Sequence, residues 1–564
     1  MPRRGSAGLV PILCGLAASL VLFWNLDARY LWQDEAATAV LGERMLSRGK
    51  PLAYDGRNLI TMDYVRPEDG AAIHRITQDA ESGVRFYVER GDFKPDMAWV
   101  GQPWGQFLLA GLSLRFLGHG TLQARLPFAL AGVLAALLLY HLARRRFDDP
   151  VLATIAVFLL VTNVFWVLHT RQCRLYPVSS LLLLATLVAY LRWSDGLRWG
   201  TPLFVAAAWS FFQFDFGTFW PVLGVLGADA LLTRQPLRRA LVAFGAVLLV
   251  IAPWIWYYEL WSRLKTGAAA TNLRVWGTVF NLNQFELPLV LVPLLLWLAW
   301  RAPRAERRLV LLCLAVFAAL LVWVPVVAPH PYHRYLVAAT PLAALLLAFA
   351  VTRVAGLLVR GAAARGLVAA ALALVLSVSP IAANAVSVWL PPYACTMSVH
   401  EPGRFLRGEI APAWLEISGR APDPNRAVID ALAPRLGPDD ELLVTYEDIP
   451  FMFYTGHRVR GGISAFRAED HSGVPPSFAV VRRSVLALHW KVFRRELQRY
   501  SWKEIPVEAP DVPFGNSPDP NHRFFPRPEE HPDVVVLERI SGEDPVSRAA
   551  PKPLPDVEPL PTLR

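Results

Sequence analysis

Two adjacent acids offer the clearest catalytic chemistry in the chain. Asp34 and Glu35 stand in the segment Trp32-Gln33-Asp34-Glu35-Ala36, just after the first long apolar stretch. A carboxylate near a low-dielectric boundary can accept a proton from a nucleophile or hold a metal ion. The same pair also fits solvated charges or acids at a helix N-terminus. Asp34 and Glu35 are therefore the candidate catalytic residues, and either is the candidate ligand of a divalent metal ion.

Two loops rich in arginine, histidine and tyrosine are the candidates for binding an anion. One covers residues 169–176 and the other residues 330–335, each at the end of an apolar stretch. Guanidinium groups are well suited to phosphate, whereas lipid snorkelling or an aromatic belt is the structural alternative. The candidate phosphate ligands are Arg171, Arg174, Tyr176, His333, Arg334 and Tyr335.

Two further polar residues near apolar stretches are candidates for binding substrate. His330 belongs to the second loop, and Asp215 ends a predicted membrane span. An ionisable group at membrane depth suggests function. If that span ends at Gln213 instead, Asp215 is an ordinary boundary acid.

The composition requires a membrane to position these groups. The 564 residues are 54% hydrophobic and 18% charged, against about 25% charged in soluble proteins, which excludes a wholly soluble chain. The net charge of +10 comes from short basic runs between apolar stretches, a pattern that orients a membrane protein and does not suggest a nucleic-acid partner. No Walker loop, dinucleotide fingerprint, HExxH helix or GxSxG elbow stands in a suitable context, so no nucleotide cofactor is expected.

Stretches long enough to cross about 30 Å of hydrocarbon predict the membrane helices. The first is read as a retained anchor, since it lacks a small-residue cleavage site. The loops predicted to be cytoplasmic carry fifteen arginines, against six Lys or Arg in the short outer loops, which places the C-terminus outside. The eleven predicted spans are 8–26, 125–143, 150–168, 177–192, 201–215, 217–232, 240–256, 287–300, 309–328, 335–352 and 366–390.

Two regions outside the spans are predicted to share the exterior. The first loop, 27–124, contains a short apolar segment at 104–117 that suits the membrane interface. In the tail, helices are expected at 426–436 and 485–500, and strands at 441–446, 478–481 and 534–537. Their alternation predicts a small α/β domain. The domains expected are a membrane catalytic domain at 1–390, an extracytoplasmic α/β domain at 391–545 and a Pro-rich tail at 546–564.

The order of these motifs resembles the GT-C superfamily of membrane glycosyltransferases, in the branch of protein O-mannosyltransferases and lipid A aminoarabinose transferases. The resemblance covers about residues 8–390 well and the tail loosely. Its matching motifs are Trp32 to Ala36, Gly101-Gln102-Pro103-Trp104-Gly105-Gln106, Arg125-Leu126-Pro127, the loop from Arg171 to Tyr176, His333-Arg334-Tyr335 ahead of Pro341, and Tyr454-Thr455-Gly456.

The resemblance implies a polytopic α-helical fold and a sugar transferase. The donor would be a polyprenyl-phosphate sugar, and the acceptor hydroxyl would belong to a protein, a lipid or a polysaccharide on the periplasmic or luminal face. Asp34 would be the base, Arg334 with Arg171 or Arg174 would stabilise the leaving phosphate, and the reaction would invert the anomeric carbon. Gln102 and Trp104 would contact substrate.

The chain departs from the family at one acidic position. Some members carry a second acid at about Tyr176, and residues 175–178 have none, which argues against a metal site built on that acid. The Arg-rich composition favours a bacterial inner membrane with an undecaprenyl or decaprenyl carrier. The alternatives are a flippase or transporter of lipid-linked sugars, a glycan ligase or polymerase, and a non-catalytic scaffold.

Overall fold

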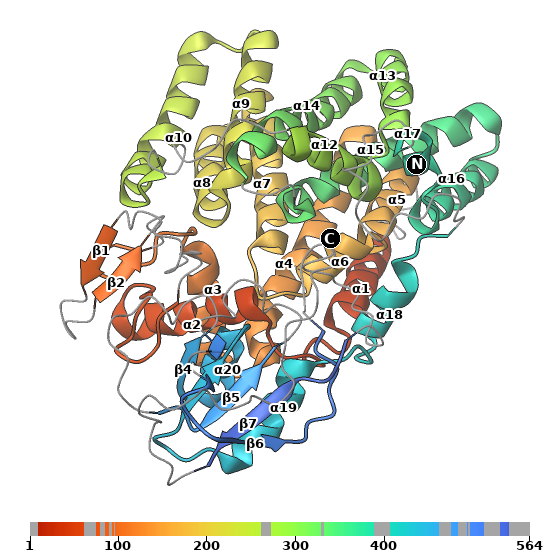
Figure 1. Ribbon diagram of the computed structural model, residues 1–564. Coiled ribbons are helices and arrows are strands. Elements are labelled where there is room, and N and C mark those ends of the chain that lie inside the picture. Colours follow the sequence, from red (N-terminus) through yellow and green to blue (C-terminus); the bar gives the residue numbers. More distant parts are fainter. Residues whose placement is uncertain are drawn as a thin grey trace. The chain divides into compact units, whose positions relative to one another are not determined.

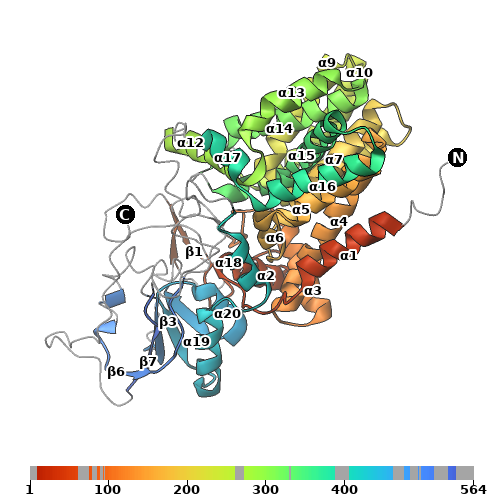
Figure 2. The same ribbon diagram turned by 90° about the vertical axis from the view of Figure 1, so that its right-hand side faces the viewer.

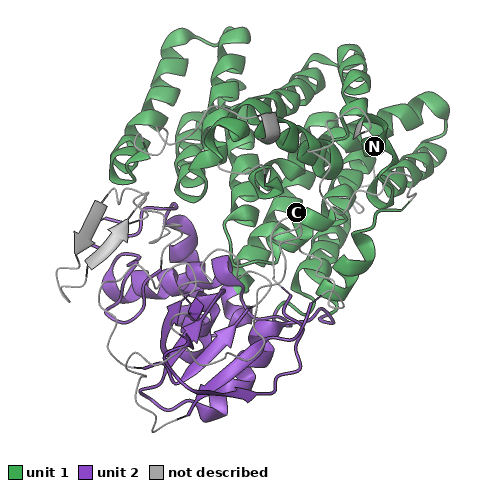
Figure 3. Cartoon of the chain, in the orientation of Figure 1, with its two compact units in different colours: residues 1–26, 125–418, 516–524 green, residues 27–124, 419–515, 525–564 purple. Residues whose placement is uncertain are grey.

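The chain forms two compact units, coloured green and purple in Figure 3. Unit 1 comprises 1–26, 125–418 and 516–524, and unit 2 comprises 27–124, 419–515 and 525–564. The computed structural model describes residues 9–60, 75–78, 85–88, 93–94, 96–260, 272–328, 332–387, 406–461, 475–482, 493–494, 497–512 and 531–540.

Unit 1 is helical throughout its described part, and α15 (Thr340–Leu358) is its central helix. Residues 340–352 of α15 are all buried, and α5 (Pro150–Val161) and α16 (Ala362–Val378) lie against it (Figures 1 and 2). The other helices of the unit are α1 (Leu9–Phe23), α4 (Thr121–Phe147), α6 (Val164–Thr170), α7 (Tyr176–Ser194), α8 (Gly200–Phe214), α9 (Phe216–Leu232), α10 (Leu237–Tyr257), α12 (Asn272–Asn281), α13 (Val292–Arg301), α14 (Arg304–Val327), α17 (Ile381–Ser387) and α18 (Ile410–Ile417), with short turns η1 (Leu282–Glu286), η2 (Leu289–Leu291), η3 (His333–Tyr335) and η4 (Val337–Ala339).

The apolar helices make the chain a multi-pass membrane protein. Within the described residues, five helices are long and apolar enough to cross a membrane, or up to seven if each of two bent pairs counts as one span. Each of the eleven predicted stretches contains helix. The predicted polytopic helical class is therefore confirmed, whereas the count of eleven spans stays a prediction.

The third predicted span is not one straight helix. Its two halves, α5 and α6, are bent by 69°. The side chain of Asn163 caps α6 by accepting a hydrogen bond from the Trp166 N–H at 2.9 Å, and its Nδ2 donates to the Phe285 carbonyl at 2.8 Å. Asparagine competes with the helical backbone for hydrogen bonds, so a run that is apolar on both sides of residue 163 still breaks there.

The segment before the eighth predicted span is also helical, which the sequence did not predict. Helical residues Arg274–Glu286 and Leu289–Arg301 form a pair bent by 76°. Leu287 and Pro288 separate them, as expected because the residue before a proline disfavours the helical region. The polar residues of 281–286 interrupt the apolar pattern on which the prediction relied.

Unit 2 contains a five-stranded mixed sheet with the strand order β4-β3-β5-β7-β6. β3 pairs in parallel with β4 and β5, and β7 is antiparallel to β5 and β6. The predicted small α/β region is thus present. The elements of the unit are α2 (Gln33–Arg48), β1 (Arg75–Gln78), β2 (Arg85–Val88), α3 (Gly105–Leu117), α19 (Pro424–Leu432), η6 (Ala433–Arg435), β3 (Glu441–Val444), α20 (Asp448–Thr455), β4 (Arg458–Gly461), β5 (Phe478–Val481), β6 (Trp502–Ile505) and β7 (Val535–Arg539).

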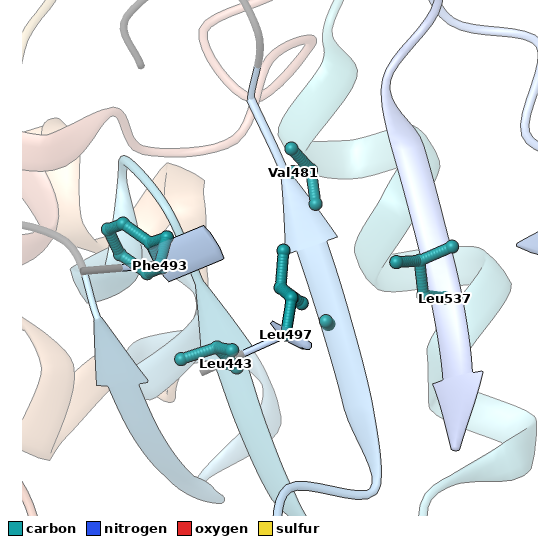
Figure 4. Close-up of a cluster of buried hydrophobic side chains, with 6 residues drawn as sticks. Leu443, Val481, Phe493, Leu497 and Leu537 are labelled. Carbon is teal, nitrogen blue, oxygen red and sulfur yellow. The ribbon is translucent and has the colours of Figure 1, made fainter. Parts of the chain in front are cut away.

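Apolar strand residues build the core of this sheet. Every residue of β3 and β5 is buried, as expected for strands covered on both faces. The predicted strands at 441–446, 478–481 and 534–537 correspond to β3, β5 and β7, and the predicted helix at 426–436 corresponds to α19 and η6. Most of the helix predicted at 485–500 and the whole Pro-rich tail lie outside the described residues. One core cluster, shown in Figure 4, consists of Leu443, Ala479, Val481, Phe493, Leu497 and Leu537.

Helices α2 and α3 of unit 2 touch through their backbones at two glycines. A Cβ atom on Gly42 would lie 2.6 Å from the Phe107 carbonyl oxygen and 2.8 Å from the Gly111 nitrogen. Both distances are shorter than atoms can approach, and the obstructing atoms are backbone. Glycine at 42 and at 111 therefore allows the helix that carries Asp34 to pack closely on α3.

We expect Gly42→Ala to lower the stability of the protein by roughly 1–3 kcal/mol, because the methyl group overpacks a backbone contact. The thermal unfolding midpoint of the purified protein in detergent measures this. The matched control is Gly224→Ala in α9, where a Cβ would meet nothing within 4 Å, and alanine there should leave the midpoint unchanged or raise it. Equal midpoints for wild type and Gly42→Ala would contradict the close approach.

Candidate active site

The two acids of the first motif have different environments at the start of α2. Glu35 is fully buried, and its Oε2 accepts a hydrogen bond from the Trp32 N–H at 3.4 Å. It thus caps the helix N-terminus, the structural alternative considered from the sequence. Asp34 is only partly buried. Of the pair, Asp34 is therefore the better placed to meet a substrate, while its catalytic role stays a prediction.

The segment leading into α2 is anchored on α19 and α20, far along the chain. The Tyr30 N–H donates to Asp423 at 2.6 Å, and the Tyr30 hydroxyl donates to Asp430 at 2.8 Å. The Tyr30 ring stacks on Tyr454 with 3.9 Å between centroids, and the Tyr454 hydroxyl accepts from the Leu31 N–H at 2.8 Å. The Tyr454-Thr455-Gly456 motif therefore contacts the residues just before Asp34.

His119 adds a second anchor between the first loop and α20. Its Nδ1 lies 2.8 Å from a carboxylate oxygen of Glu43 on α2, and its Nε2 lies 3.0 Å from the Phe453 carbonyl oxygen. Both neighbours are acceptors, so the protonated ring, with two N–H donors, suits the site best. The hydrogen bond to Glu43, followed by the charge of Glu43, raises the pKa of His119 although partial burial opposes this.

The two loop residues expected to contact substrate hold the turn into α3. Trp104 Nε1 donates to the Trp99 carbonyl at 2.7 Å, and the Gln102 side-chain oxygen accepts from Gln106 at 3.0 Å. Both side chains are partly exposed. Their contact with a substrate stays a prediction.

Arg171 in unit 1 is bound to the end of α1. Its guanidinium donates to the carbonyl oxygens of Val21, Leu22 and Asn25 at 3.0, 3.1 and 3.1 Å, and Arg125 donates to the Leu26 carbonyl at 2.9 Å. A helix C-terminus leaves carbonyls without intrahelical partners and attracts cations. These contacts give Arg171 a structural role that the sequence prediction of phosphate binding did not anticipate.

Arg174 and Tyr176 follow in the same loop. Arg174 is buried, and Tyr176 begins α7 and packs edge-on against His169 with 4.9 Å between ring centroids. His169 Nδ1 is 2.7 Å from the Phe165 carbonyl oxygen. The contact between His169 on α6 and Tyr176 on α7 thus joins the two ends of the loop that carries Arg174.

His333 in the second loop forms a buried pair with an acid that the sequence prediction missed. His333 Nε2 lies 2.7 Å from Glu286 Oε1, which also accepts from the Thr340 hydroxyl at 2.9 Å. The side chains of His333 and Glu286 have no exposed surface. The pair ties η3, and with it Arg334 and Tyr335, to the π-helical turn η1. The polar run 281–286 beside a predicted span was the available signal.

Arg334 is the partly exposed cation of the second loop. Its guanidinium lies over the rings of Tyr332 and Tyr335, at 4.7 and 5.4 Å from their centroids. Cation–π contacts of this kind hold a guanidinium over an aromatic face, and a guanidinium is well suited to binding phosphate. His330 lies outside the described residues.

Asp215 links α8 to α9 as a helix cap. Its Oδ1 accepts from the Thr218 N–H at 2.9 Å, and α8 ends at Phe214. These contacts favour the boundary-acid interpretation, and substrate binding by Asp215 stays a prediction.

The side chains that usually bind a metal ion in proteins are those of His, Cys, Asp and Glu. In the described part of the chain, no group of three or more of these side chains could hold one. Binding of a divalent metal ion by Asp34 or Glu35 stays a prediction.

The arrangement of helices and the mixed sheet is similar to the fold of solved ArnT structures. ArnT from Cupriavidus metallidurans bound to undecaprenyl phosphate shares 17% identity with this chain at a TM-score of 0.56, covering 95% of this chain and 99% of ArnT. Apo ArnT gives 16% identity and a TM-score of 0.55, with 93% and 97% covered. The Archaeoglobus fulgidus oligosaccharyltransferase gives 13% identity and a TM-score of 0.47, with 89% and 74% covered. Comparison with protein-family models and with curated proteins finds no match.

We expect the His119 anchor to stabilise unit 2 in a pH-dependent way. Because the pKa of His119 is raised in the folded protein, its contribution is complete below the unfolded value of about 6.5 and is lost as the pH rises through the folded pKa. His119→Phe keeps a ring against Phe453 and removes both N–H groups. The difference in unfolding midpoint between wild type and His119→Phe should be largest in mildly acidic buffer and shrink towards alkaline pH. A difference independent of pH would contradict this account.

Proposed function

We propose that the chain is a glycosyltransferase that moves a sugar from a polyprenyl-phosphate donor to an acceptor hydroxyl on the extracytoplasmic face of a bacterial inner membrane. The observation that carries the proposal is the GT-C fold, shared with ArnT over 95% of this chain. The ArnT structure contains undecaprenyl phosphate, which supports a donor of the same lipid class here. The excess of arginine in alternate loops supports the orientation.

Asp34 acts as the general base. It takes the proton of the acceptor hydroxyl as the oxygen attacks the anomeric carbon of the donor. The bond between that carbon and the phosphate oxygen breaks, polyprenyl phosphate leaves with the electron pair, and Asp34 passes its proton to water. A single displacement inverts the anomeric carbon. Partial exposure of Asp34, against complete burial of Glu35, supports this division of roles.

Arg174 and Arg334 stabilise the charge that builds up on the leaving phosphate. Three guanidinium hydrogen bonds of Arg171 go to carbonyls at the end of α1, so Arg171 supports the loop that carries Arg174. Tyr335 holds Arg334 by a cation–π contact, and the hydrogen bond between His333 and Glu286 anchors the loop that carries Arg334. Tyr176 remains a candidate ligand of the phosphate. Fixed donors directed at developing charge are among the largest contributions to catalysis.

Asp34→Asn should greatly slow sugar transfer without unfolding the protein, because asparagine has the same shape and cannot accept the proton. The assay supplies membranes containing the protein with a panel of labelled undecaprenyl-phosphate hexoses and pentoses and follows release of the lipid phosphate. General-base removal costs about 10²–10⁴-fold in rate.

The matched control for this variant is Asp27→Asn, an exposed acid of the same unit, which should transfer at the wild-type rate. Undiminished transfer by a well-folded Asp34→Asn protein would remove Asp34 as the base.

The arginine roles predict opposite outcomes for two equivalent substitutions. Arg334→Gln should lower kcat by about 10²–10³-fold, as for the loss of one donor to a developing anion, with little change in the unfolding midpoint. Arg171→Gln should chiefly lower stability, by roughly 1.5–3 kcal/mol for a charged donor. Steady-state kinetics and thermal unfolding on both proteins check this, and a reversal of the two patterns would overturn the assignment.

A further inference from the structure

We propose that the C-terminal α/β domain positions the catalytic acid, through a buried chain of contacts that runs from Arg482 to Glu447, then to Asp448 and Ile449, and finally to Gln33. Gln33 is therefore a positioning residue for Asp34, the next residue in the chain. The proposal rests on the proposed function, in which Asp34 is the base. All of these residues belong to unit 2.

The first link is the carboxamide of Gln33, the first residue of α2. Its Nε2 donates to Asp448 Oδ1 at 2.8 Å, and its Oε1 accepts from the Ile449 N–H at 3.2 Å. Gln33 is 3% exposed and Asp448 is fully buried. Because both ends of the amide are used, the side chain fixes the first turn of α2 against the start of α20, beside which α2 lies (Figure 1).

The second link is the backbone of Glu447, between β3 and α20. Glu447 has φ 58° and ψ 47°, a left-handed conformation that a residue with a side chain adopts only under constraint. This conformation sets the direction in which Asp448 and the Ile449 N–H face Gln33. Such strain persists only where surrounding contacts enforce it, and it is concentrated at functional sites.

The third link is Arg482, which supplies that constraint. Its guanidinium donates to Glu447 Oε2 at 2.6 Å, to Asp511 at 2.5 Å, to the Asn425 side-chain oxygen at 2.7 Å and to the Val512 carbonyl at 3.2 Å. Arg482 is 1% exposed, and Glu447 and Asp511 are fully buried. A buried ion pair need not add stability compared with apolar packing. We therefore infer that this cluster serves to hold the left-handed backbone conformation of Glu447.

The Arg482 cluster lies at the carboxyl-terminal edge of parallel strands, where functional groups of α/β sheets are often found. Arg482 directly follows β5, and Glu447 follows β3 by a short turn, so both lie at the carboxyl ends of parallel strands. In open α/β sheets this edge usually receives a ligand. Here the N-terminal end of α2 lies at this edge. Its first residue, Gln33, is bound there and is adjacent to Asp34 in the chain.

The test replaces the donor of the hydrogen bond between Gln33 and Asp448 by an acceptor, and then restores the bond with the donor on residue 448. Gln33→Glu sets a second carboxylate against Asp448, whereas the double variant Gln33→Glu with Asp448→Asn restores a donor opposite an acceptor. We expect Gln33→Glu to lower kcat by about 10- to 10²-fold, the scale of a displacement near 1 Å, with the donor KM within about twofold of wild type. The double variant should recover most of the rate. Unfolding midpoints accompany each assay, and Gln33→Asn replaces Gln33→Glu if the latter unfolds.

Tyr30→Phe is the matched control, because it removes one hydrogen bond of the same docked segment, to Asp430, away from the α2 helix. Its kcat should stay within about twofold of wild type. A wild-type rate for Gln33→Glu, no recovery in the double variant, or an equal loss in Tyr30→Phe would overturn the positioning role. Asp34→Asn is run in parallel: if it is inactive while Gln33→Glu is normal, only the positioning proposal fails. An active Asp34→Asn removes Asp34 as the base, and no sugar transfer by the wild-type protein removes the proposed function itself.

Discussion

The hydrogen bonds of the Gln33 carboxamide join parts of the chain 415 residues apart, and the organisation of unit 2 depends on them together with the neighbouring contacts of Tyr30 and Leu31. A polar side chain that is buried must find partners, and those of Gln33 lie on α20. The first loop and most of the tail, residues 419–515 and 525–564, belong to one compact unit. A tail that looks like an appendage in the sequence therefore contributes to the environment of Asp34.

The sequence predicted the helices well because apolar composition over a span's length is a strong local signal. It failed where one polar residue outweighed many apolar ones. The Asn163 side chain starts a second helix at the break by accepting from the Trp166 N–H, and it also donates to the Phe285 carbonyl. An average of hydropathy over a window does not detect such a break. In the tail, β3 and β5 were predicted from short apolar runs, whereas β4 and β6, with basic or acidic residues at half their positions, were not.

The residue types of the candidate site could be predicted from the sequence. Which of two similar residues has a structural role could not. Asp34 and Glu35 are adjacent and chemically alike, and only the fold shows that Glu35 is buried against the Trp32 N–H. Arg171 and Arg174 likewise look equivalent in the sequence, but Arg171 donates hydrogen bonds to carbonyl oxygens at the end of α1. Glu286 was missed because its partner, His333, comes from a distant loop. Partners far apart in sequence leave no trace in local periodicity.

The central claim is that Asp34 acts as a base for a single displacement at the anomeric carbon. The most direct measurement is the anomeric configuration of the sugar before and after transfer, determined by NMR on donor and product. Inversion is expected, with a product anomer opposite to that of the polyprenyl-phosphate donor. Retention of configuration would require a second displacement, which this account does not contain, and would contradict it.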